Sequence, residues 1–232
     1  MQQRPNIVFY FSDQQRWDTL GCYGQRLDVT PNLDALAAGG TRYENAFTCQ
    51  PVCGPARACL QTGRYATEIG CEINGFALPF GRVKTLAQCF NEAGYATGYV
   101  GKWHLATDRL AGIDYEQSAI PAERRGGYKD YWMAADVLEF TSHGYNGYVY
   151  NADNERVPFM GYRADCINNF AIDFLHGRKE QTEPFFLFIS QIEPHHQNDR
   201  RRYEGPDGSR AQFADFQAPG DLVACSKACE QG

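Results

Sequence analysis

The sequence lacks any apolar run long enough to cross a membrane. Its longest apolar runs, Ile7–Phe11 and Phe185–Ile189, have the length of β-strands and fall far short of the ~18 residues that a membrane span needs. Residues 1–5 lead directly into the first apolar run, with neither an apolar signal region nor a small-residue cleavage site. We therefore expect a cytoplasmic protein without a membrane partner.

Positive charge is also scarce. The chain has 22 Lys and Arg against 28 Asp and Glu, a formal net charge of −6, and no basic block. Nucleic acids are bound through clusters of Lys and Arg, so we expect no nucleic-acid partner. None of the nine cysteines forms a C-x-x-C pair, which excludes a zinc knuckle or a thioredoxin-type motif. In a cytoplasm these cysteines are expected to be reduced, and most of them to be small buried side chains.

The composition is that of an ordinary globular protein, with 43% hydrophobic and 22% charged residues in 232, which excludes disorder along the whole length. Three apolar, β-rich runs alternate with amphipathic segments. We predict strands over 6–12, 96–101 and 184–192, helices over 33–38, 55–62, 85–93 and 163–175, and a short strand over 42–47. This alternation predicts an α/β fold with a mostly parallel sheet sandwiched by helices.

Polar residues follow each of the three strong strands. Asp13 follows the first, Lys102 and His104 follow the second, and His195 follows the third. Ligands of open α/β sheets bind beyond the carboxyl ends of the strands, so these residues are candidates for one site. The alternative is that strand ends are polar because they meet solvent.

Two segments fit this pattern poorly. Residues 105–162 are rich in Tyr, Gly and charge, and we interpret them as an excursion over the sheet edge, either a substrate-facing insertion or an irregular surface decoration. Residues 197–232 show no regular pattern, and long irregular stretches are unusual inside compact domains. We therefore expect an irregular tail, and a chain that stops partway through a larger domain.

The segment around Cys53 is the sharpest motif, with the sequence CGPARACLQTGR over residues 53–64. Pro55 marks the start of a helix, so Cys53 lies where free N–H groups and the helix dipole favour a thiolate or a bound anion. Arg57 lies one turn further along the same face. On these residues alone, the motif is either a nucleophilic cysteine beside an anion-binding arginine or an ordinary capped helix.

A resemblance favours the first reading. C-x-P-x-R followed by L-x-T-G-R resembles the signature of the type I sulfatases, in the alkaline phosphatase-like superfamily. Segments 5–16, 30–37 and 101–105 are similar to other sulfatase motifs, and Pro194-His195 resembles the later P-H motif of that family. The matches occur in family order, cover residues 5–105 and about 184–196, and assign 1–196 to the N-terminal part of a sulfatase catalytic domain.

The resemblance implies a sulfuric ester hydrolase that cleaves a sulfate monoester in a sulfated small molecule or sugar. Cys53 would be converted to formylglycine by a maturation enzyme, and its aldehyde hydrate would be the nucleophile. Asp13, Gln14 and Cys53 would hold a divalent cation, usually Ca²⁺, with Mg²⁺ as an alternative. Gln14 stands where the family often has a second Asp, and an amide oxygen binds a hard cation more weakly than a carboxylate does.

The same resemblance gives roles to the remaining candidates. Arg57 and Lys102 would hold the nucleophile and the sulfate oxygens. His104 would hydrogen-bond the aldehyde hydrate and help to expel sulfate. His195 would face the leaving-group oxygen; the alternative is a solvated loop histidine beside His196.

One departure from the family is marked. The family completes its metal site with a later Asp followed by Asn or His and adds a late Lys, and no such pattern follows Ile192. The tail Leu222–Gly232, with Cys225 and Cys229, does not resemble family sequence. We therefore expect this chain to hydrolyse sulfate esters poorly. Two alternatives stay open: a phosphonate or phosphate ester hydrolase of the same superfamily, and a truncated, non-catalytic remnant.

Overall fold

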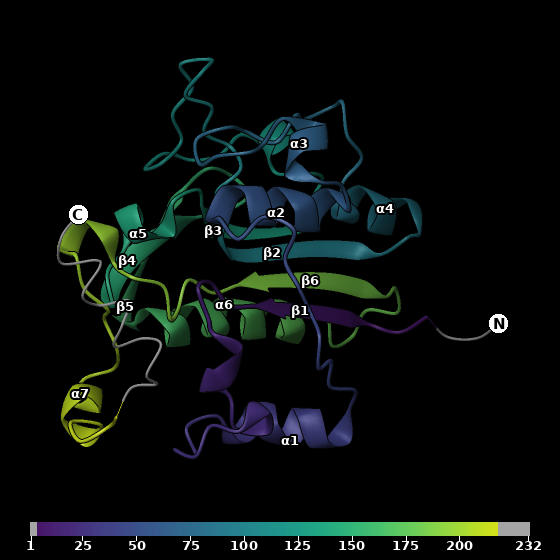
Figure 1. Cartoon of the computed structure of the whole chain (residues 1–232). Helices are drawn as coiled ribbons and strands as arrows, with labels where there is room; N and C mark the ends of the chain where they lie inside the picture. Colours follow the sequence, from purple (N-terminus) through teal and green to yellow (C-terminus); the bar gives the residue numbers. More distant parts are fainter. Residues whose placement is uncertain (1–3, 218–232) are drawn as a thin grey trace.

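The computed structural model describes residues 4–217 (Figure 1). Six strands form one sheet: β1 (Ile7–Phe11), β2 (Ala96–Lys102), β3 (Tyr131–Ala135), β4 (Tyr145–Tyr150), β5 (Arg156–Tyr162) and β6 (Phe185–Ser190). The α-helices are α1 (Pro31–Gly39), α2 (Cys53–Thr62), α3 (Ala66–Ile69), α4 (Leu86–Glu92), α5 (Leu138–Thr141), α6 (Arg163–Gly177) and α7 (Ser209–Gln212). Short 3₁₀ turns lie at Trp17–Thr19, Gly21–Tyr23, Ala122–Arg124 and Asn198–Arg200. No helix in this range is long and apolar enough to cross a membrane.

The sheet has the strand order β1-β6-β2-β3-β4-β5. The first four strands in that order run parallel, and β4 and β5 add an antiparallel hairpin at one end. Helices α2 and α4 cover one face of the sheet and α6 covers the other (Figure 1). The predicted α/β fold with a mostly parallel, helix-covered sheet is therefore confirmed.

Each face of the sheet has its own apolar core. On the face of α2 and α4, Tyr99 stacks on Phe188, with 5.2 Å between ring centroids. On the face of α6, Ile167 and Phe174 belong to the core that contains Val100 of β2. Neighbouring β2 residues thus point to opposite faces, as the period of a strand requires. Because both faces are buried, the central strands read as continuous apolar runs rather than as alternating ones.

The strand register aligns the carboxyl ends that carry the polar candidates. Ser190 at the end of β6 lies opposite Phe11 of β1 and Gly101 of β2. Gly101 has a φ of 102°, and a Cβ there would lie 2.0 Å from the Ser190 carbonyl oxygen. Only glycine tolerates this close approach of two strands. The residues that follow β1, β2 and β6 consequently emerge at one edge of the sheet.

Most predicted elements are present, and two interpretations need correction. Residues 42–47 form no strand, because Tyr43 and Phe47 are 71% and 91% exposed and have no core to face. Residues 105–162 are more than an excursion over the sheet edge: they contain α5 and the strands β3, β4 and β5, which extend the sheet itself. β3 has only five residues, of which Tyr131 and Trp132 alone favour strands, so its local pattern is weak.

The segment after β6 is held to the body of the protein by Glu204. Its Oε2 accepts a hydrogen bond of 2.7 Å from the Gly144 N–H, and its Oε1 pairs with Arg200 at 2.9 Å and Arg202 at 2.8 Å. The expected irregular tail is thus ordered in part, with only the short α7 as a helix between 201 and 217. The segment 222–232, noted above for its lack of resemblance, lies outside the described residues.

Glu204 makes the stability of the fold depend on acid. Burial acts to raise the pKa of Glu204, but bonds from Gly144, Arg202 and Arg200 outweigh it and lower the pKa to about 2. A depressed pKa contributes stability above the ordinary value of 4.5, which is lost as the pH falls towards 2. We expect this contribution to be on the order of 2 kcal/mol. Urea denaturation of wild type and Glu204→Gln at pH 6 and pH 3 should show the two converging at low pH; a constant difference would contradict the assignment.

Candidate active site

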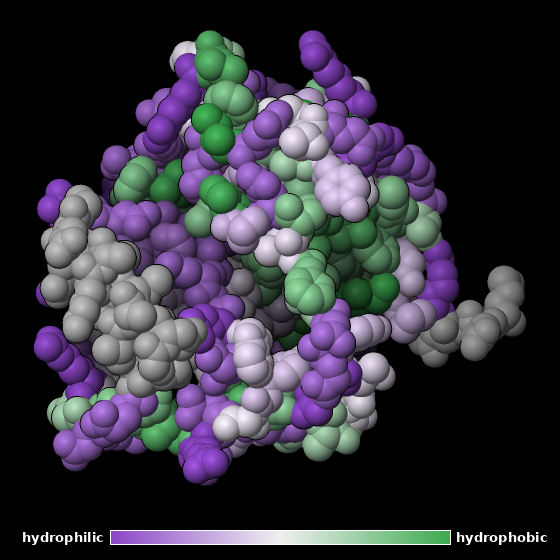
Figure 2. All heavy atoms as spheres, viewed as in Figure 1, coloured by the Kyte–Doolittle hydropathy of each residue, from purple (hydrophilic) through white to green (hydrophobic). Residues whose placement is uncertain are grey.

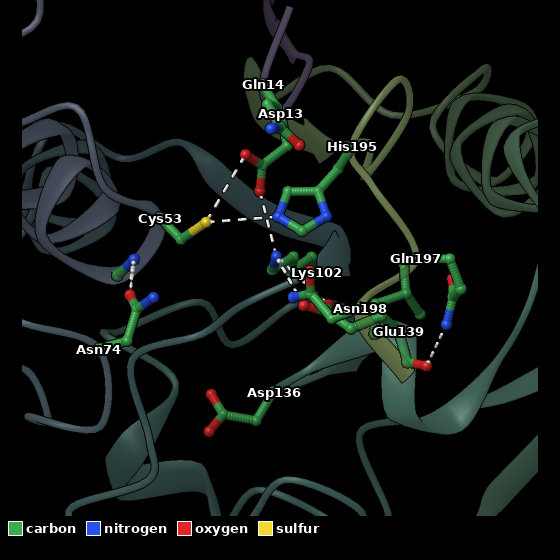
Figure 3. A network of polar contacts seen from close by, with 12 residues as sticks. Asp13, Gln14, Cys53, Asn74, Lys102, Asp136, Glu139, His195, Gln197 and Asn198 are labelled. Carbon is green, nitrogen blue, oxygen red and sulfur yellow. Dashed lines mark hydrogen bonds and ion pairs between the residues drawn. The ribbon is translucent and has the colours of Figure 1, made fainter. Parts of the chain in front are cut away.

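Five of the predicted site residues meet at the carboxyl edge of the sheet, and Figure 3 shows four of them, Asp13, Cys53, Lys102 and His195. Asp13 follows β1, Lys102 ends β2, and His195 follows β6, while Cys53 and Arg57 come from the first turn and a half of α2. A cleft of about 790 Å³ opens onto this point, with one wall formed by residues 46–52. Figure 2 shows this face of the molecule, with apolar side chains gathered around its hollowed centre.

Buried charges form a chain through the site. Oδ2 of Asp13 lies 2.9 Å from Arg57 Nη2 and 3.1 Å from Lys102 Nζ. The Lys102 ammonium also lies 3.3 Å from Glu139 of α5. Lys102, Arg57 and Glu139 are almost fully buried, so none of these charges is compensated by water. Two cations and two anions balance, which is the condition for keeping ions in an interior.

Arg57 is fixed by more than its ion pair. Its Nη1 donates to the Lys102 carbonyl at 2.8 Å and to Ser190 Oγ at 2.5 Å. Its guanidinium also lies over the Phe11 ring, 5.2 Å from the centroid. The planar fork of an arginine serves these partners at once, which a lysine cannot do. Arg57 thus connects the ends of β1, β2 and β6 while presenting positive charge to the site.

Cys53 stands between Asp13 and His195. Its Sγ lies 3.6 Å from His195 Nε2 and 3.9 Å from Asp13 Oδ1. The N–H of Gly54 has no partner within the helix, because it lies at the helix N-terminus, and it donates to Asn74 Oδ1 at 2.9 Å. His195 Nδ1 lies 2.5 Å from the His196 carbonyl oxygen, so Nδ1 carries the proton and Nε2 presents a lone pair towards Cys53.

The surroundings set the protonation of these groups. Burial acts to raise the pKa of Asp13, but Lys102 and Arg57 outweigh it and hold that pKa well below its usual range. Burial raises the pKa of the Cys53 thiol, against the opposing charge of Lys102. Burial and Lys102 lower the pKa of His195. The thiolate that the helix N-terminus alone would favour is therefore not the resting form of Cys53.

His104 lies beside the cluster in a strained loop that Asp136 holds. His104 has a φ of 60°, and its Nδ1 is buried without a hydrogen-bond partner among the described residues. Burial, Lys102 and Arg57 lower its pKa well below the usual value. The loop that follows is fixed by the buried carboxylate of Asp136, which accepts three backbone N–H bonds of 2.9–3.0 Å from residues 105–107.

Gln14 does not point towards Cys53. Its Oε1 accepts a hydrogen bond of 2.9 Å from the His196 N–H, and its φ of 55° turns the chain sharply after Asp13. A metal-ligating role for Gln14 therefore stays a prediction. Among the described Asp, Glu, Cys and His side chains, one group has ligand atoms that all lie within 4.8 Å of one another: Asp13, Cys53 and His195.

Several residues of the site were not singled out from the sequence. Glu139 and Asp136 lie in the segment interpreted as an excursion, and nothing in their local pattern marks them. Asn74, which accepts the hydrogen bond of the Gly54 N–H, lies in a loop 20 residues after Gly54. Ser190 belongs to a predicted strand, and its position at the end of a buried, otherwise apolar run was the available signal for a polar role.

Comparisons with known proteins identify the family of the chain. The family model for sulfatases matches residues 5–221. This chain belongs to the sulfatase family. It is 38% identical over 204 residues to the uncharacterised sulfatase YidJ of Escherichia coli (strain K12), covering 84% of this chain and 39% of the relative. It is 42% identical over 221 residues to human arylsulfatase A, covering 83% of this chain and 41% of that protein.

Solved structures of sulfatases and of a related hydrolase share the fold of this chain. A structure of BT4656 in complex with its substrate, D-glucosamine-2-N,6-O-disulfate, aligns with a TM-score of 0.75 at 27% identity, covering 95% of this chain and 40% of that one. A phosphonate monoester hydrolase of Agrobacterium radiobacter aligns with a TM-score of 0.56 at 25% identity, covering 83% of this chain and 41% of that one. The chain thus spans about 40% of the length of these relatives.

Proposed function

We propose that this chain forms the nucleophile-bearing part of a sulfuric ester hydrolase, in which Cys53 is converted to formylglycine. The observation that carries the proposal is the position of Cys53, at the N-terminus of α2 and 3.6 Å from His195 Nε2. The buried cations Arg57 and Lys102 lie behind it, both paired with Asp13. Family membership supports the same reaction class.

A thiol is poorly suited to this chemistry at residue 53. Its raised pKa leaves it protonated, and a sulfated thiol or alcohol has no second group with which to expel sulfate. A formylglycine hydrate supplies one hydroxyl to attack sulfur and a second whose collapse to the aldehyde releases sulfate. The aldehyde then adds water to re-form the hydrate, so no water has to attack a sulfo-enzyme.

Proton transfer is assigned to His195, and stabilisation of negative charge to Arg57 and Lys102. His195 Nε2, unprotonated in the resting site, accepts the proton of the attacking hydroxyl. The leaving alkoxide departs on the opposite side of sulfur and takes its proton from solvent, to which His195 then gives up its own. Arg57 and Lys102 are preorganised positive charges, and each such element contributes about 10²–10³ in rate where charge develops in the transition state. His104 is proposed to contact the hydrate, as the resemblance implies.

The proposed cation of the active form is Ca²⁺ or Mg²⁺, which take oxygen ligands. The donor set in the thiol form does not fit them, because Asp13 contributes its oxygen beside a sulfur and an imidazole nitrogen. Conversion of Cys53 would replace the sulfur by oxygen. Even then Ca²⁺ takes six to eight oxygens, so Asp13 and the converted residue 53 would supply only part of its coordination shell.

We propose sulfated sugars as the substrate class and a formylglycine-generating enzyme as a partner. The sugar proposal is supported by the substrate named for BT4656 and by a relative, 32% identical, named as an N-acetylglucosamine-6-O-sulfatase of Bacteroides thetaiotaomicron. The likeness to a phosphonate monoester hydrolase favours a second candidate, hydrolysis of phosphonate or phosphate esters, because those anions need the same cage of positive charge.

Turnover by the protein after co-expression with a formylglycine-generating enzyme tests the proposal. We expect hydrolysis of an aryl sulfate to exceed that of an aryl phosphonate, and Lys102→Ala to lower the sulfatase rate by about 10²–10³. Lys84→Ala, which removes an exposed ion pair with Glu92, is the matched control and should leave the rate unchanged. Faster turnover of the phosphonate would support the second candidate, and no turnover of either ester would support a non-catalytic remnant.

A further inference from the structure

Three side chains that line the cleft, those of Asp13, Cys53 and His195, bring one oxygen, one sulfur and one nitrogen within 4.8 Å of one another (Figure 3). In its thiol form, this group differs in chemistry from the oxygen site of a converted sulfatase. We propose that the unconverted chain binds Zn²⁺ through Cys53 Sγ, His195 Nε2 and Asp13 Oδ1, with the fourth position open to the cleft.

The distances between these atoms suit a tetrahedral zinc ion. Zinc binds sulfur at about 2.3 Å and nitrogen or oxygen at about 2.0–2.2 Å, so two ligand atoms at the tetrahedral angle are about 3.5 Å apart. Cys53 Sγ lies 3.6 Å from His195 Nε2 and 3.9 Å from Asp13 Oδ1. Both separations are within a few tenths of an ångström of this spacing. These two sulfur separations therefore suit the ion, and the Asp13 and His195 ligand atoms lie within 4.8 Å of each other, so we expect them to approach when zinc binds.

His195 and Asp13 each have one donor atom that is already bonded and one that is left for the ion. The bonded atom fixes the direction in which the other points. His195 Nδ1 donates to the His196 carbonyl at 2.5 Å, the kind of bond by which a zinc-binding histidine is oriented. Asp13 Oδ2 is occupied by Arg57 and Lys102, and Oδ1 is the oxygen nearer to the sulfur. Each side chain thus offers one donor atom in a fixed direction.

The charge balance of the site also allows Zn²⁺ to bind. Asp13 and Glu139 balance Arg57 and Lys102 before the metal arrives. Binding displaces the proton of the Cys53 thiol to solvent as the zinc–sulfur bond forms, so Zn²⁺ and the thiolate together add one positive charge. The cleft on which Asp13, Cys53 and His195 border leaves room for water or an anion at the fourth position, as in zinc sites with three protein ligands.

This site has a consequence for maturation. Zinc on the Cys53 sulfur and formylglycine at the same residue exclude each other, because conversion removes the sulfur that the ion needs. Zinc binding by the thiol form does not depend on any hydrolytic activity of the converted form. If one of these two proposals is contradicted, the other is unaffected.

Cobalt is the probe for this site, because a tetrahedral Co²⁺ thiolate complex absorbs visible and near-ultraviolet light. The 232-residue chain, expressed without a maturation enzyme, reduced and freed of metal, is titrated with Co²⁺ and then with Zn²⁺. We expect one equivalent of Co²⁺ to give thiolate charge-transfer and tetrahedral bands that Zn²⁺ abolishes and Ca²⁺ does not. Cys53→Ala and His195→Ala should lose the bands, and Cys49→Ala, a cysteine of the same cleft, should keep them.

A second measurement on the wild-type chain guards against variants that fail to fold. Peptide mass spectrometry follows alkylation of Cys53 with and without Zn²⁺, and we expect protection of Cys53 by Zn²⁺ but not by Ca²⁺, while Cys49, which is exposed, stays reactive. Bands that persist in Cys53→Ala, bands absent from the wild type, or equal alkylation of Cys53 with and without Zn²⁺ would each overturn the proposal.

Discussion

Replacement of Arg57 by alanine should destabilise the protein by about 3–5 kcal/mol, the usual cost of breaking a buried ion pair from one side. Arg57 is 3% exposed and has three polar partners, Asp13, Ser190 and the Lys102 carbonyl. Without it, two carboxylates face one buried ammonium. The free energy of unfolding, measured in urea, gives the loss directly.

Two variants separate charge balance from packing. Asp13→Asn in the Arg57→Ala background removes the unpaired negative charge, so we expect it to restore part of the lost stability. Arg64→Ala breaks an exposed pair with Glu68, one helical turn apart, and should cost less than about 1 kcal/mol. A loss at Arg57 no larger than that at Arg64, or no recovery in the double variant, would contradict the charge network.

The second large effect is expected at Asp136. Its carboxylate is fully buried and accepts the N–H groups of Leu105, Ala106 and Thr107. Asp136→Ala leaves three buried donors unpaired. Because each such donor costs about 1–3 kcal/mol, we expect a loss of about 3 kcal/mol or more. Thermal and urea unfolding of the variant measure it.

The same change keeps the 2.7 Å bond from the His104 N–H to the main-chain carbonyl of residue 136 but frees the loop that follows His104. Asp136→Asn keeps one accepting oxygen and should fall between wild type and alanine. Asp108→Ala is the matched control, because Asp108 accepts the N–H groups of Leu110 and Ala111 in an exposed loop and should cost less than about 1 kcal/mol. Equal losses of unfolding free energy in Asp136→Ala and Asp108→Ala would contradict this account, because they would show that burial of the loop over residues 105–107 does not affect its contribution to stability.

The sequence predicted the part of the site that follows from chain order and short spacing. Asp13, Lys102 and His195 could be placed together because the carboxyl ends of parallel strands share one edge. Cys53 and Arg57 could be placed on one helical face because they are four residues apart. These inferences need only local pattern and a sheet.

What escaped prediction depends on contacts between distant segments. Glu139 reaches Lys102 across 37 positions, because α5 follows β3 and β3 pairs with β2. With β3 unpredicted, neither Glu139 nor Asp136 could be placed. The role that the resemblance gives Arg57, holding the nucleophile and the sulfate, stays a prediction; its contacts with Asp13, Ser190 and the Lys102 carbonyl could not be predicted from local pattern.

The chemical state of residue 53 tests the central claim most directly. The chain is co-expressed with a formylglycine-generating enzyme, and its peptides are analysed by mass spectrometry after capture of aldehydes with a hydrazide. We predict an aldehyde at residue 53 and at none of the other eight cysteine positions, with none formed in a chain carrying Arg57→Ala within the C-x-P-x-R motif. An unmodified thiol at Cys53 in the wild-type chain, under conditions that convert an established sulfatase, would contradict the account.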